Sequence, residues 1–533
     1  MSEKNYISLT ILETSDVHGN IFPITYGTNE EANLGLAKVA TIVKKEKQST
    51  PYTLVIDNGD LIQGTPLTYH FVKFGEQKLN PMIQVLNELQ YDAGVIGNHE
   101  FNYGMKVLNQ AVSESRFPWI SCNILHKSTK EPFFGKPYLM KEFEDGPKVA
   151  VLGVTTHYIP NWENPNHIKD LYFEDAFQAT KKWVEYIREV EQPDLLVVSY
   201  HGGFEKDLET GEPTEPLTGE NQAYEICSKI QGIDVLLTGH QHRKIAVDSL
   251  NGVTVVQPSF NGQGVGKVQI DFMKNTHSWE IMKKRSEVIQ LDGIETESHI
   301  VELTYSYEEE TQKWLDQPIG HIEGDMEIHD PMRVRVEKHP LIEFINKVQM
   351  EATGAKISNT ALFNNTSKGF TSVVTMRDLV SNYVYPNTLT VIEISGADMK
   401  AALEQSASYF QLNSDGTIGV NPSFSEPKPQ HYNYDMWDGV EYTIDVSQSI
   451  GERITKLEMN GQPIQPHEKY EVVMNNYRAG GGGEYTMFKD KPITKEIQTD
   501  MTELLANYFM KHKTVKAEIH RNWEVIGGEY KEK

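Results

Sequence analysis

The stretch Val95–Gly104 reads VIGNHEFNYG and places three polar side chains directly after an apolar run. The run Ala93–Ile96 predicts a short buried strand. Asn98, His99 and Glu100 follow it, so an amide, an imidazole and a carboxylate stand at the carboxyl end of that strand. Open α/β sheets place their chemistry at this edge. Taken alone, the triplet is explained as well by helix capping, because Asn often precedes a helix and Glu often starts one.

Two earlier strands end in the same way. Ile7–Leu12 predicts a strand that is followed by Asp16 and His18, and residues two apart in an extended chain point to the same side. Tyr52–Ile56 predicts the next strand, and Asp60 follows it. The first strands of the chain therefore all lead into polar side chains that can bind a cation or act on a substrate.

The pattern continues downstream with helices between the strands. Residues 194–199 predict a buried strand followed by His201, and residues 234–237 predict another followed by His240 and His242. Alternating strands and helices indicate parallel pairing through right-handed crossovers, and so an α/β domain. The intervening helical patterns cover residues 34–47, 81–89, 174–190 and 222–230.

Each of these polar residues also has an ordinary explanation. Asp60 could belong to an Asx turn, and His201 could be a core histidine whose hydrogen bonds are satisfied. His240 and His242 could simply flank a turn. Jointly, these explanations require five independent coincidences at one sheet edge, so we favour a shared site. Its candidate ligands are Asp16, His18, Asp60, Asn98, His201, His240 and His242.

The chemistry of this ligand set indicates the kind of metal. Carboxylates and imidazoles with one amide oxygen suit Mn, Zn or Fe, and no thiolate is involved. Seven ligands are too many for one tetrahedral ion. They fit two divalent ions that share a bridging carboxylate and lie about 3.5–4 Å apart, as in two-metal phosphoesterases.

The motifs occur in a recognisable order: Asp-x-His, Gly-Asp-x(3)-Gly, Gly-Asn-His-Glu, His-Gly and Gly-His-x-His. This order resembles the calcineurin-like metallophosphoesterases, and nearly the whole chain resembles the bacterial 5′-nucleotidase / 2′,3′-cyclic-nucleotide 2′-phosphodiesterase family. The resemblance implies an α/β fold: a four-layer α/β/β/α metallophosphoesterase domain at 1–300, a helical connector or hinge at 301–338, and an α/β nucleotide-specificity domain at 339–533. Punctuation of residues 316–338 by Pro and Gly fits such a connector.

The resemblance also assigns roles to the candidate residues. It implies that His99 contacts the phosphate and supports the leaving oxygen, which suits general-acid chemistry by an imidazole near neutral pH. The ligand sets that it implies are Asp16, His18, Asp60 and His242 for one metal, and Asp60 (bridging), Asn98, His201 and His240 for the other.

In the second domain the resemblance implies two aromatic rings that clamp the nucleobase. The matching loops offer Tyr434 and Tyr485, and base stacking is worth about 1–3 kcal/mol per base. Tyr432 and Trp437 lie in the same loop as Tyr434, and aromatic burial alone cannot separate the three. Arg478 precedes a run of four glycines and is the best candidate for a cationic contact with substrate.

Two departures from the 5′-nucleotidase branch point to the cyclic-phosphodiesterase branch. The catalytic His is followed three residues later by Asn102 instead of Asp, and an asparagine can orient an imidazole but adds no negative charge. Residues 358–366 lack the arginine that grips a dianionic monoester. A cyclic diester carries only one negative charge and needs fewer cationic contacts.

The expected activity is therefore hydrolysis of 2′,3′-cyclic nucleotides to 3′-nucleotides, with hydrolysis of 3′-nucleotides to nucleosides as a second step, by attack of a metal-bound hydroxide. One alternative is a 5′-nucleotidase or nucleotide-sugar hydrolase of the same family. Another is a nucleotide-binding sensor without catalysis. Catalytic roles are predicted for His99 and Asn102, and substrate contacts for Tyr434, Tyr485 and Arg478.

Composition limits the partners. The chain of 533 residues has a formal charge of −25, which repels nucleic acid polymers, so a nucleotide is the expected partner. Cys122 and Cys227 predict no disulfide framework. The absence of a basic and apolar leader, of a long apolar run and of a terminal anchor predicts a soluble cytoplasmic protein with no membrane partner, as a monomer or weak dimer.

Overall fold

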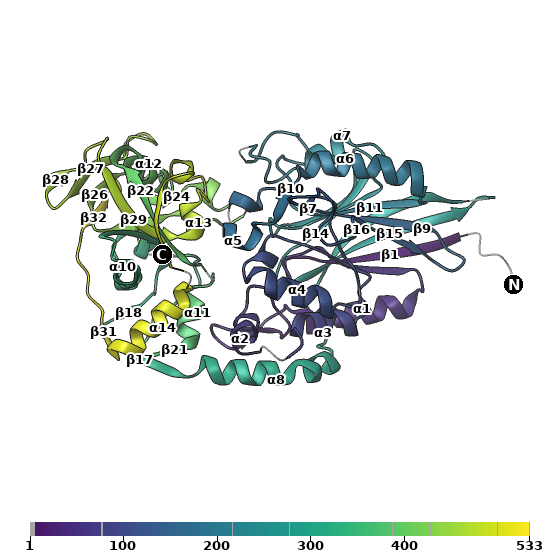
Figure 1. Ribbon diagram of the computed structural model, residues 1–533, viewed down its shortest axis with the longest axis horizontal. Coiled ribbons are helices and arrows are strands. Elements are labelled where there is room, and N and C mark those ends of the chain that lie inside the picture. The colour runs from purple at the N-terminus through teal and green to yellow at the C-terminus, as the bar shows by residue number, and fades with distance from the viewer. Residues whose placement is uncertain are drawn as a thin grey trace. The chain divides into compact units, whose positions relative to one another are not determined.

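The structure is a computed structural model that describes residues 6–75, 78–161, 163–215, 217–276, 278–385, 387–426, 428–497 and 499–531. The chain divides into two compact units, the first ending at Thr311 and the second beginning at Gln312. Figure 1 shows both units and labels many of their helices and strands. Helix α8 (Ser298–Leu315) contains the division.

The first sheet of the N-terminal unit contains the strands that precede Asp16, Asp60 and Asn98. Strands β1, β4, β5 and β6 run parallel, and β15 pairs with β1 in the antiparallel sense. The sheet order β16-β15-β1-β4-β5-β6 comprises Trp279–Gln290, Gly264–Lys274, Tyr6–Thr14, Thr53–Asp57, Ala93–Val95 and Trp119–Ile120.

The second sheet contains the strands that precede His201 and His240. Strands β9, β11, β12 and β14 run parallel, and antiparallel strands form both edges. The order β13-β14-β12-β11-β9-β8 comprises Lys244–Leu250, Val253–Pro258, Val235–Thr238, Leu195–His201, Lys148–Thr155 and Tyr138–Glu142. Small strands elsewhere in the unit are β2 (Ile24–Thr25), β3 (Glu30–Glu31), β7 (Ile124–His126) and β10 (Leu171–Phe173).

The two sheets pack face to face, and helices cover their outer faces. Leu9 and Ile56 of the first sheet share one buried apolar cluster with Val151 and Val197 of the second. Figure 1 shows α6 and α7 on one outer side of this unit and α1, α3 and α4 on the opposite side. The expected four-layer α/β/β/α fold is confirmed. Its helices are α1 (Leu36–Ser49), α2 (Pro66–Phe74), α3 (Pro81–Glu88), α4 (Gly104–Glu114), α5 (Pro165–Ile168), α6 (Ala176–Tyr186) and α7 (Ala223–Lys229).

Local sequence explains where several helices begin. The Asn80 side chain accepts hydrogen bonds from the first turn of α3, and Pro81 occupies the first helical position, where its missing N–H costs nothing. Asp175 caps α6 in the same way, through the N–H of Gln178. These caps fix the residue at which each helix begins.

One sequence-based expectation needs correction: the five strand ends do not lie on a single sheet. Strands β1, β4 and β5 belong to one sheet, whereas β11 and β12 belong to the other. The strand pattern alone could not show this, because continuous apolar runs fit any parallel strand that is buried on both faces. The polar residues still converge, since the carboxyl ends of both sets of strands lead into the same group of loops.

The second unit has several smaller sheets around one apolar core. The five-stranded sheet β25-β19-β29-β22-β30 comprises Asp435–Asp438, Ile357–Ala361, Lys469–Asn475, Leu389–Ser395 and Ile493–Ile497, and the four-stranded sheet β28-β27-β26-β32 comprises Gln462–Pro463, Ile454–Met459, Glu441–Asp445 and Trp523–Ile526. The remaining strands are β17 (Pro318–Glu323), β18 (Met326–Glu327), β20 (Gly369–Phe370), β21 (Val373–Thr375), β23 (Phe410–Leu412), β24 (Ile418–Val420) and β31 (Thr514–Lys516). Its helices are α9 (Pro331–Val336), α10 (Pro340–Thr353), α11 (Met376–Asn382), α12 (Gly396–Ala407), α13 (Asn476–Ala479) and α14 (Met501–His512).

Residues 312–338, expected within a connector, are part of this second unit. Strand β17 pairs with β21 and β31, and Met326 and Val334 are buried in the core of the unit. Pro318 and Pro331 therefore begin a strand and a helix, Gly324 follows the end of β17, and Gly320 lies within β17. Hinge motion through 301–338 stays a prediction. Among the described residues, no helix has both the length and the apolar character needed to cross a membrane.

Candidate metal centre

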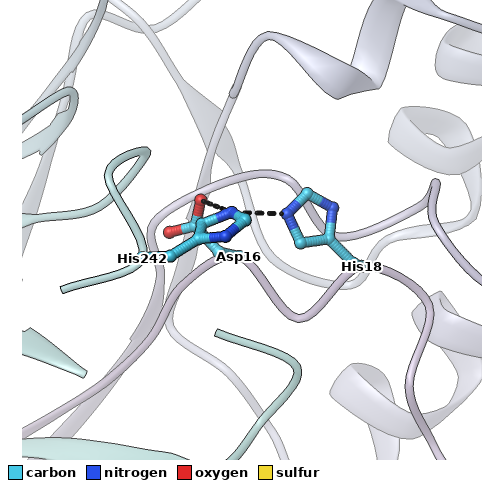
Figure 2. Close-up of side chains that lie close together, drawn as sticks. All are labelled: Asp16, His18 and His242. Carbon is cyan, nitrogen blue, oxygen red and sulfur yellow. Dashed lines mark hydrogen bonds and ion pairs between the residues drawn. The ribbon is translucent and has the colours of Figure 1, made fainter. Parts of the chain in front are cut away.

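Asp16, His18 and His242 form the first cluster of candidate ligands, which Figure 2 shows. The Nε2 atoms of His18 and His242 lie 3.0 Å apart, and His242 Nε2 lies 3.4 Å from Asp16 Oδ1. Asp16 is fully buried, and His242 stacks on the Phe260 ring with centroids 4.7 Å apart. Two imidazole nitrogens and a carboxylate oxygen thus face one point.

Asp60, His201 and His240 form the second cluster, and Asn98 lies among them. His201 Nε2 lies 3.3 Å from Asp60 Oδ2 and 3.1 Å from Asn98 Oδ1. His240 Nδ1 lies 2.9 Å from the same Asn98 oxygen. All seven predicted ligands are therefore in or beside the two clusters.

Backbone hydrogen bonds join the two clusters to each other and to His99. The His240 N–H donates to both carboxylate oxygens of Asp16, each at 3.0 Å. The His99 N–H donates to Asp60 Oδ1 at 2.8 Å. These bonds fix the Asp16 carboxylate relative to the loop that carries His240, and the Asp60 carboxylate relative to the loop that carries His99.

The ligand loops adopt a backbone conformation that L-residues rarely take. Five of the seven ligands have a positive φ: Asp16 (53°), His18 (49°), Asp60 (56°), His240 (66°) and His242 (59°). Such a conformation costs about 1–3 kcal/mol per non-glycine residue and recurs at functional sites that the surrounding structure holds in place. Backbone strain at five of the candidate ligands indicates that these residues form a functional site and do not merely occupy five ordinary turns.

The electrostatics of the site favour bound positive charge. Burial opposes protonation of His201, yet the neighbouring Asp60 and Asp16 carboxylates raise its pKa to about 10. Burial also opposes ionisation of Asp16, but hydrogen bonding and charge from His242 lower the pKa of that carboxyl. Burial is the main reason that the pKa of His18 falls to about 4. Buried carboxylates that stay ionised make this a site for cations.

Hydrogen bonds outside the clusters orient the imidazole rings. His18 Nδ1 donates to the Gln63 carbonyl at 3.2 Å and His201 Nδ1 donates to the Asn58 carbonyl at 2.7 Å, which leaves each Nε2 lone pair directed into its cluster. His240 is held the other way round: Nε2 donates to Glu220 Oε1 at 2.8 Å, and Nδ1 faces the cluster. Such partners fix the tautomer of metal-binding histidines. The residues present therefore fit two divalent ions, and the donor set suits Mn, Zn or Fe.

Glu100 has a structural role at the site that the sequence did not reveal. It is completely buried and accepts hydrogen bonds from four backbone N–H groups: Gly97 (2.7 Å), Asp60 (2.8 Å), Leu61 (2.6 Å) and Ile62 (3.3 Å). This one carboxylate ties the loop after β4 to the loop after β5. The only sequence signal was its position after His99, which capping explained equally well.

His99 and Asn102 form the pair that the sequence singled out for catalysis. His99 Nδ1 lies 2.6 Å from Asn102 Oδ1, and the His99 ring centroid lies 5.2 Å from that of His18. The ring thus lies beside the first cluster, with its Nδ1 side fixed by the amide. Asn102 belongs to the turn between β5 and α4.

The three residues predicted to contact substrate in the second unit are buried. Tyr434 and Tyr485 have no exposed surface; the Tyr434 hydroxyl donates to the Arg335 carbonyl at 2.9 Å, and that of Tyr485 donates to the Asn433 carbonyl at 3.0 Å. The Arg478 guanidinium is 1% exposed and pairs with Asp435, with Nε 2.7 Å from Oδ2. In this conformation all three hold loops together and offer substrate no free face.

A partly exposed group of tyrosines comprises Tyr432 and Tyr477 from these loops and Tyr385 from the segment after α11. Tyr385, Tyr432 and Tyr477 each keep part of their side chain accessible. The ring centroid of Tyr432 lies 6.4 Å from that of Tyr385 and 6.4 Å from that of Tyr477. Of the three aromatic residues that the sequence could not separate, Tyr432 is the accessible one, because Tyr434 and Trp437 are fully buried.

Comparison with known proteins agrees with this geometry. Residues 9–244 match the family described as calcineurin-like phosphoesterase, and residues 318–490 match the family described as 5′-nucleotidase, C-terminal domain. A Staphylococcus aureus protein provisionally described as a 5′-nucleotidase, solved in complex with α-ketoglutarate, is 34% identical with a TM-score of 0.89, over 98% of this chain and all of that one. The chain belongs to the calcineurin-like phosphoesterases that carry a 5′-nucleotidase C-terminal domain.

Two curated members of this phosphoesterase family match along the chain. The Bacillus subtilis trifunctional nucleotide phosphoesterase protein YfkN is 27% identical over 97% of this chain, which spans only 39% of that larger protein. A Yersinia enterocolitica 2′,3′-cyclic-nucleotide 2′-phosphodiesterase/3′-nucleotidase is also 27% identical, over 97% of this chain and 88% of its own length. Family membership makes the chain a metal-dependent phosphoester hydrolase; identity at this level leaves its substrate open.

Proposed function

We propose that the protein hydrolyses 2′,3′-cyclic nucleotides to 3′-nucleotides and, in a second reaction, 3′-nucleotides to nucleosides. The observation that carries this proposal is the position of the His99–Asn102 pair beside two three-residue ligand clusters. The amide of Asn102 stands where the 5′-nucleotidase branch has a carboxylate. The name of the Yersinia relative supports the same substrate class.

The chain's own residues suit this reaction. When two divalent ions are bound, they polarise the phosphate oxygens and ease deprotonation of the attacking water. We propose Asp16, His18, Asp60 and His242 as the ligands of one ion and Asp60, Asn98, His201 and His240 as those of the other. Water adds to phosphorus, the P–O2′ bond breaks, and O2′ takes a proton. His99 is placed to hold that proton on its Nε2, because Asn102 occupies its Nδ1.

A substrate panel tests the choice of substrate. With Mn²⁺ added, we expect a higher kcat/KM for 2′,3′-cyclic AMP than for 5′-AMP or a uridine diphosphate sugar. Faster turnover of 5′-AMP or of the nucleotide sugar would replace this proposal with the 5′-nucleotidase or nucleotide-sugar hydrolase alternative. The lack of an arginine at 358–366 and the single charge of a cyclic diester support the first outcome.

For nucleobase binding we propose the accessible tyrosines in place of the buried ones. Stacking on one ring is worth about 1–3 kcal/mol, so Tyr432→Ala or Tyr477→Ala should raise KM by about 5- to 150-fold and leave kcat unchanged. Tyr434→Phe is the matched control, since it removes only a buried hydroxyl. An unchanged KM in both alanine variants would count against Tyr432 and Tyr477 as the stacking residues.

Metal analysis separates the enzyme from a nucleotide-binding sensor. We expect about two divalent ions per chain and full loss of turnover on chelation. A metal-free preparation that still binds nucleotide would support the sensor. We further propose a cytoplasmic monomer or weak dimer, which cell fractionation and sedimentation of the native protein check.

A further inference from the structure

A buried carboxylate outside the ligand clusters continues the hydrogen-bond chain of His99. The Asn102 Nδ2 amide donates to Glu163 Oε2 at 2.8 Å. The Glu163 Oε1 atom accepts from the Asn164 backbone N–H at 2.7 Å, and His167 Nδ1 lies 2.9 Å from it. Only 5% of the Glu163 side chain is exposed. His99, Asn102 and Glu163 therefore form a line of three side chains whose far end is anchored to backbone.

The direction of this line follows from what each group can donate. A carboxylate only accepts hydrogen bonds, so Glu163 must face the NH₂ side of the Asn102 amide. The carbonyl side of that amide then faces His99, which must present Nδ1–H to it. With the proton of the neutral ring on Nδ1, its Nε2 is the atom left to face substrate.

We propose that Glu163 is a positioning residue that sets the tautomer of His99 through Asn102. This inference rests on the proposed phosphoesterase function, because it assigns how the proton-holding ring is oriented. In a His–Asp pair, the aspartate both contacts the histidine and supplies the carboxylate acceptor. Here Asn102 contacts His99, and Glu163 supplies the carboxylate from a loop 61 residues further along the chain. Asn102 transmits the orientation without adding a charge beside the ring.

Glu163→Gln tests the proposal, because the backbone fixes how the new amide must lie. The Asn164 N–H still needs an acceptor, so the carbonyl oxygen of the glutamine takes the position of Oε1. Its NH₂ group then faces Asn102, which must turn over and present NH₂ to His99. We expect the neutral His99 ring to shift its proton from Nδ1 to Nε2.

Asn102→Asp provides a rescue that a merely structural contact would not show. Alone, it sets two carboxylates about 2.8 Å apart, the present length of the Asn102–Glu163 hydrogen bond, and their repulsion should lower kcat. In the double variant, the carboxylate that Asn102→Asp introduces accepts from both the glutamine NH₂ and His99 Nδ1–H, so the tautomer returns. Two harmful substitutions should therefore compensate each other.

Two measurements test whether Glu163 sets the tautomer of His99. The first is the ¹⁵N spectrum of the His99 ring in metal-free, histidine-labelled protein, which reports the tautomer whether or not the enzyme turns over; His99→Gln assigns the signal. We expect Nδ1–H in the wild type, Nε2–H in Glu163→Gln and Nδ1–H again in the double variant. A ring that keeps its tautomer in Glu163→Gln overturns the proposal. This readout stands even if the wild type shows no phosphoesterase activity, an outcome that would refute the proposed function separately.

The second readout is the dependence on leaving group. For 2′,3′-cyclic AMP, kcat should fall about 10- to 100-fold in Glu163→Gln, which is less than the 10²–10⁴ that complete loss of acid–base assistance costs. For bis(4-nitrophenyl) phosphate, whose phenolate leaves without a proton, kcat should change little. The exposed Glu131→Gln is the charge-matched control and should match the wild type. Equal losses on both substrates, or a double variant no better than either single one, would reject the proposal.

Discussion

Glu100→Gln is the most informative test of how the ligand loops are held. The carboxylate is completely buried and accepts four backbone N–H groups, two on each oxygen. A glutamine of the same shape offers one acceptor oxygen and one NH₂ group. In either orientation of the glutamine amide, two of these four backbone N–H groups face its NH₂ group and so lose their acceptor.

The loss of stability in Glu100→Gln follows from the number of hydrogen bonds that it removes. A hydrogen bond to a charged group contributes about 1.5–3 kcal/mol, and a buried donor without an acceptor adds a further penalty. The two bonds to Oε1, from Leu61 and Ile62, form the weaker pair because the Ile62 contact is 3.3 Å long. We therefore expect the NH₂ group of the glutamine to take the position of Oε1, so that these two bonds are lost. We expect the free energy of unfolding of the N-terminal unit to fall by about 3–5 kcal/mol, or roughly 5–15 °C in Tm.

Differential scanning calorimetry of metal-free protein measures this change, and titration with Mn²⁺ measures its effect on the ligands. We expect metal affinity to fall about 10- to 100-fold, since the Asp60 N–H is one of the bonded groups. The exposed Glu209→Gln is the control for loss of a charge. A Tm within about 1 °C of the wild type would show that the four hydrogen bonds do not hold the loops together.

Three further predictions follow from residues at or beyond the site. A Cβ on Gly239 would lie 2.1 Å from Ser15 Oγ, which donates a hydrogen bond to Asp16 Oδ2, and 2.7 Å from Asp16 Oδ2 itself, so Gly239→Ala should weaken Mn²⁺ binding about 10- to 100-fold in calorimetric titration, and unchanged affinity would count against Asp16 as a ligand. His99→Ala should lower kcat about 10²–10⁴-fold with two ions still bound; an unchanged rate removes the ring from the mechanism. Burial and the charge of Arg335 lower the pKa of His431 to about 4, so the unfolded chain binds more protons between pH 4 and 6.5 and stability is lost as pH falls through that window. His431→Gln should abolish uptake of about one proton on unfolding there, and an identical pH–stability slope in both proteins would contradict this.

The convergence of the candidate metal ligands could be predicted from sequence because each of them follows a strand. Parallel strands within an α/β unit carry their carboxyl ends to one place, so a polar residue after Val95 or Thr238 meets one after Thr14 without any knowledge of side-chain contacts. The pattern could not show that the strands form two sheets, because an apolar run looks the same whichever of the two sheets its strand joins.

Residues whose role depends on distant partners could not be predicted. Glu163 lies 61 positions from Asn102, and nothing between them in sequence signals the contact. The aromatic residues of the second unit could not be told apart from sequence for a related reason. Tyr432 and Tyr434 are two positions apart in one loop, and only the packing around them decides that the first stays accessible and the second is buried.

The order of strands in the first sheet has a consequence for synthesis on the ribosome. Strand β1 lies between β4 and β15, and Tyr6 pairs with Met273. One edge of the first strand to emerge therefore waits for a partner that is translated almost 270 residues later. An unpaired edge invites association with other nascent chains, and contacts so distant in sequence form slowly. A truncated protein ending before Gly264 would keep that edge open permanently, and we expect it to aggregate although all seven ligands are present.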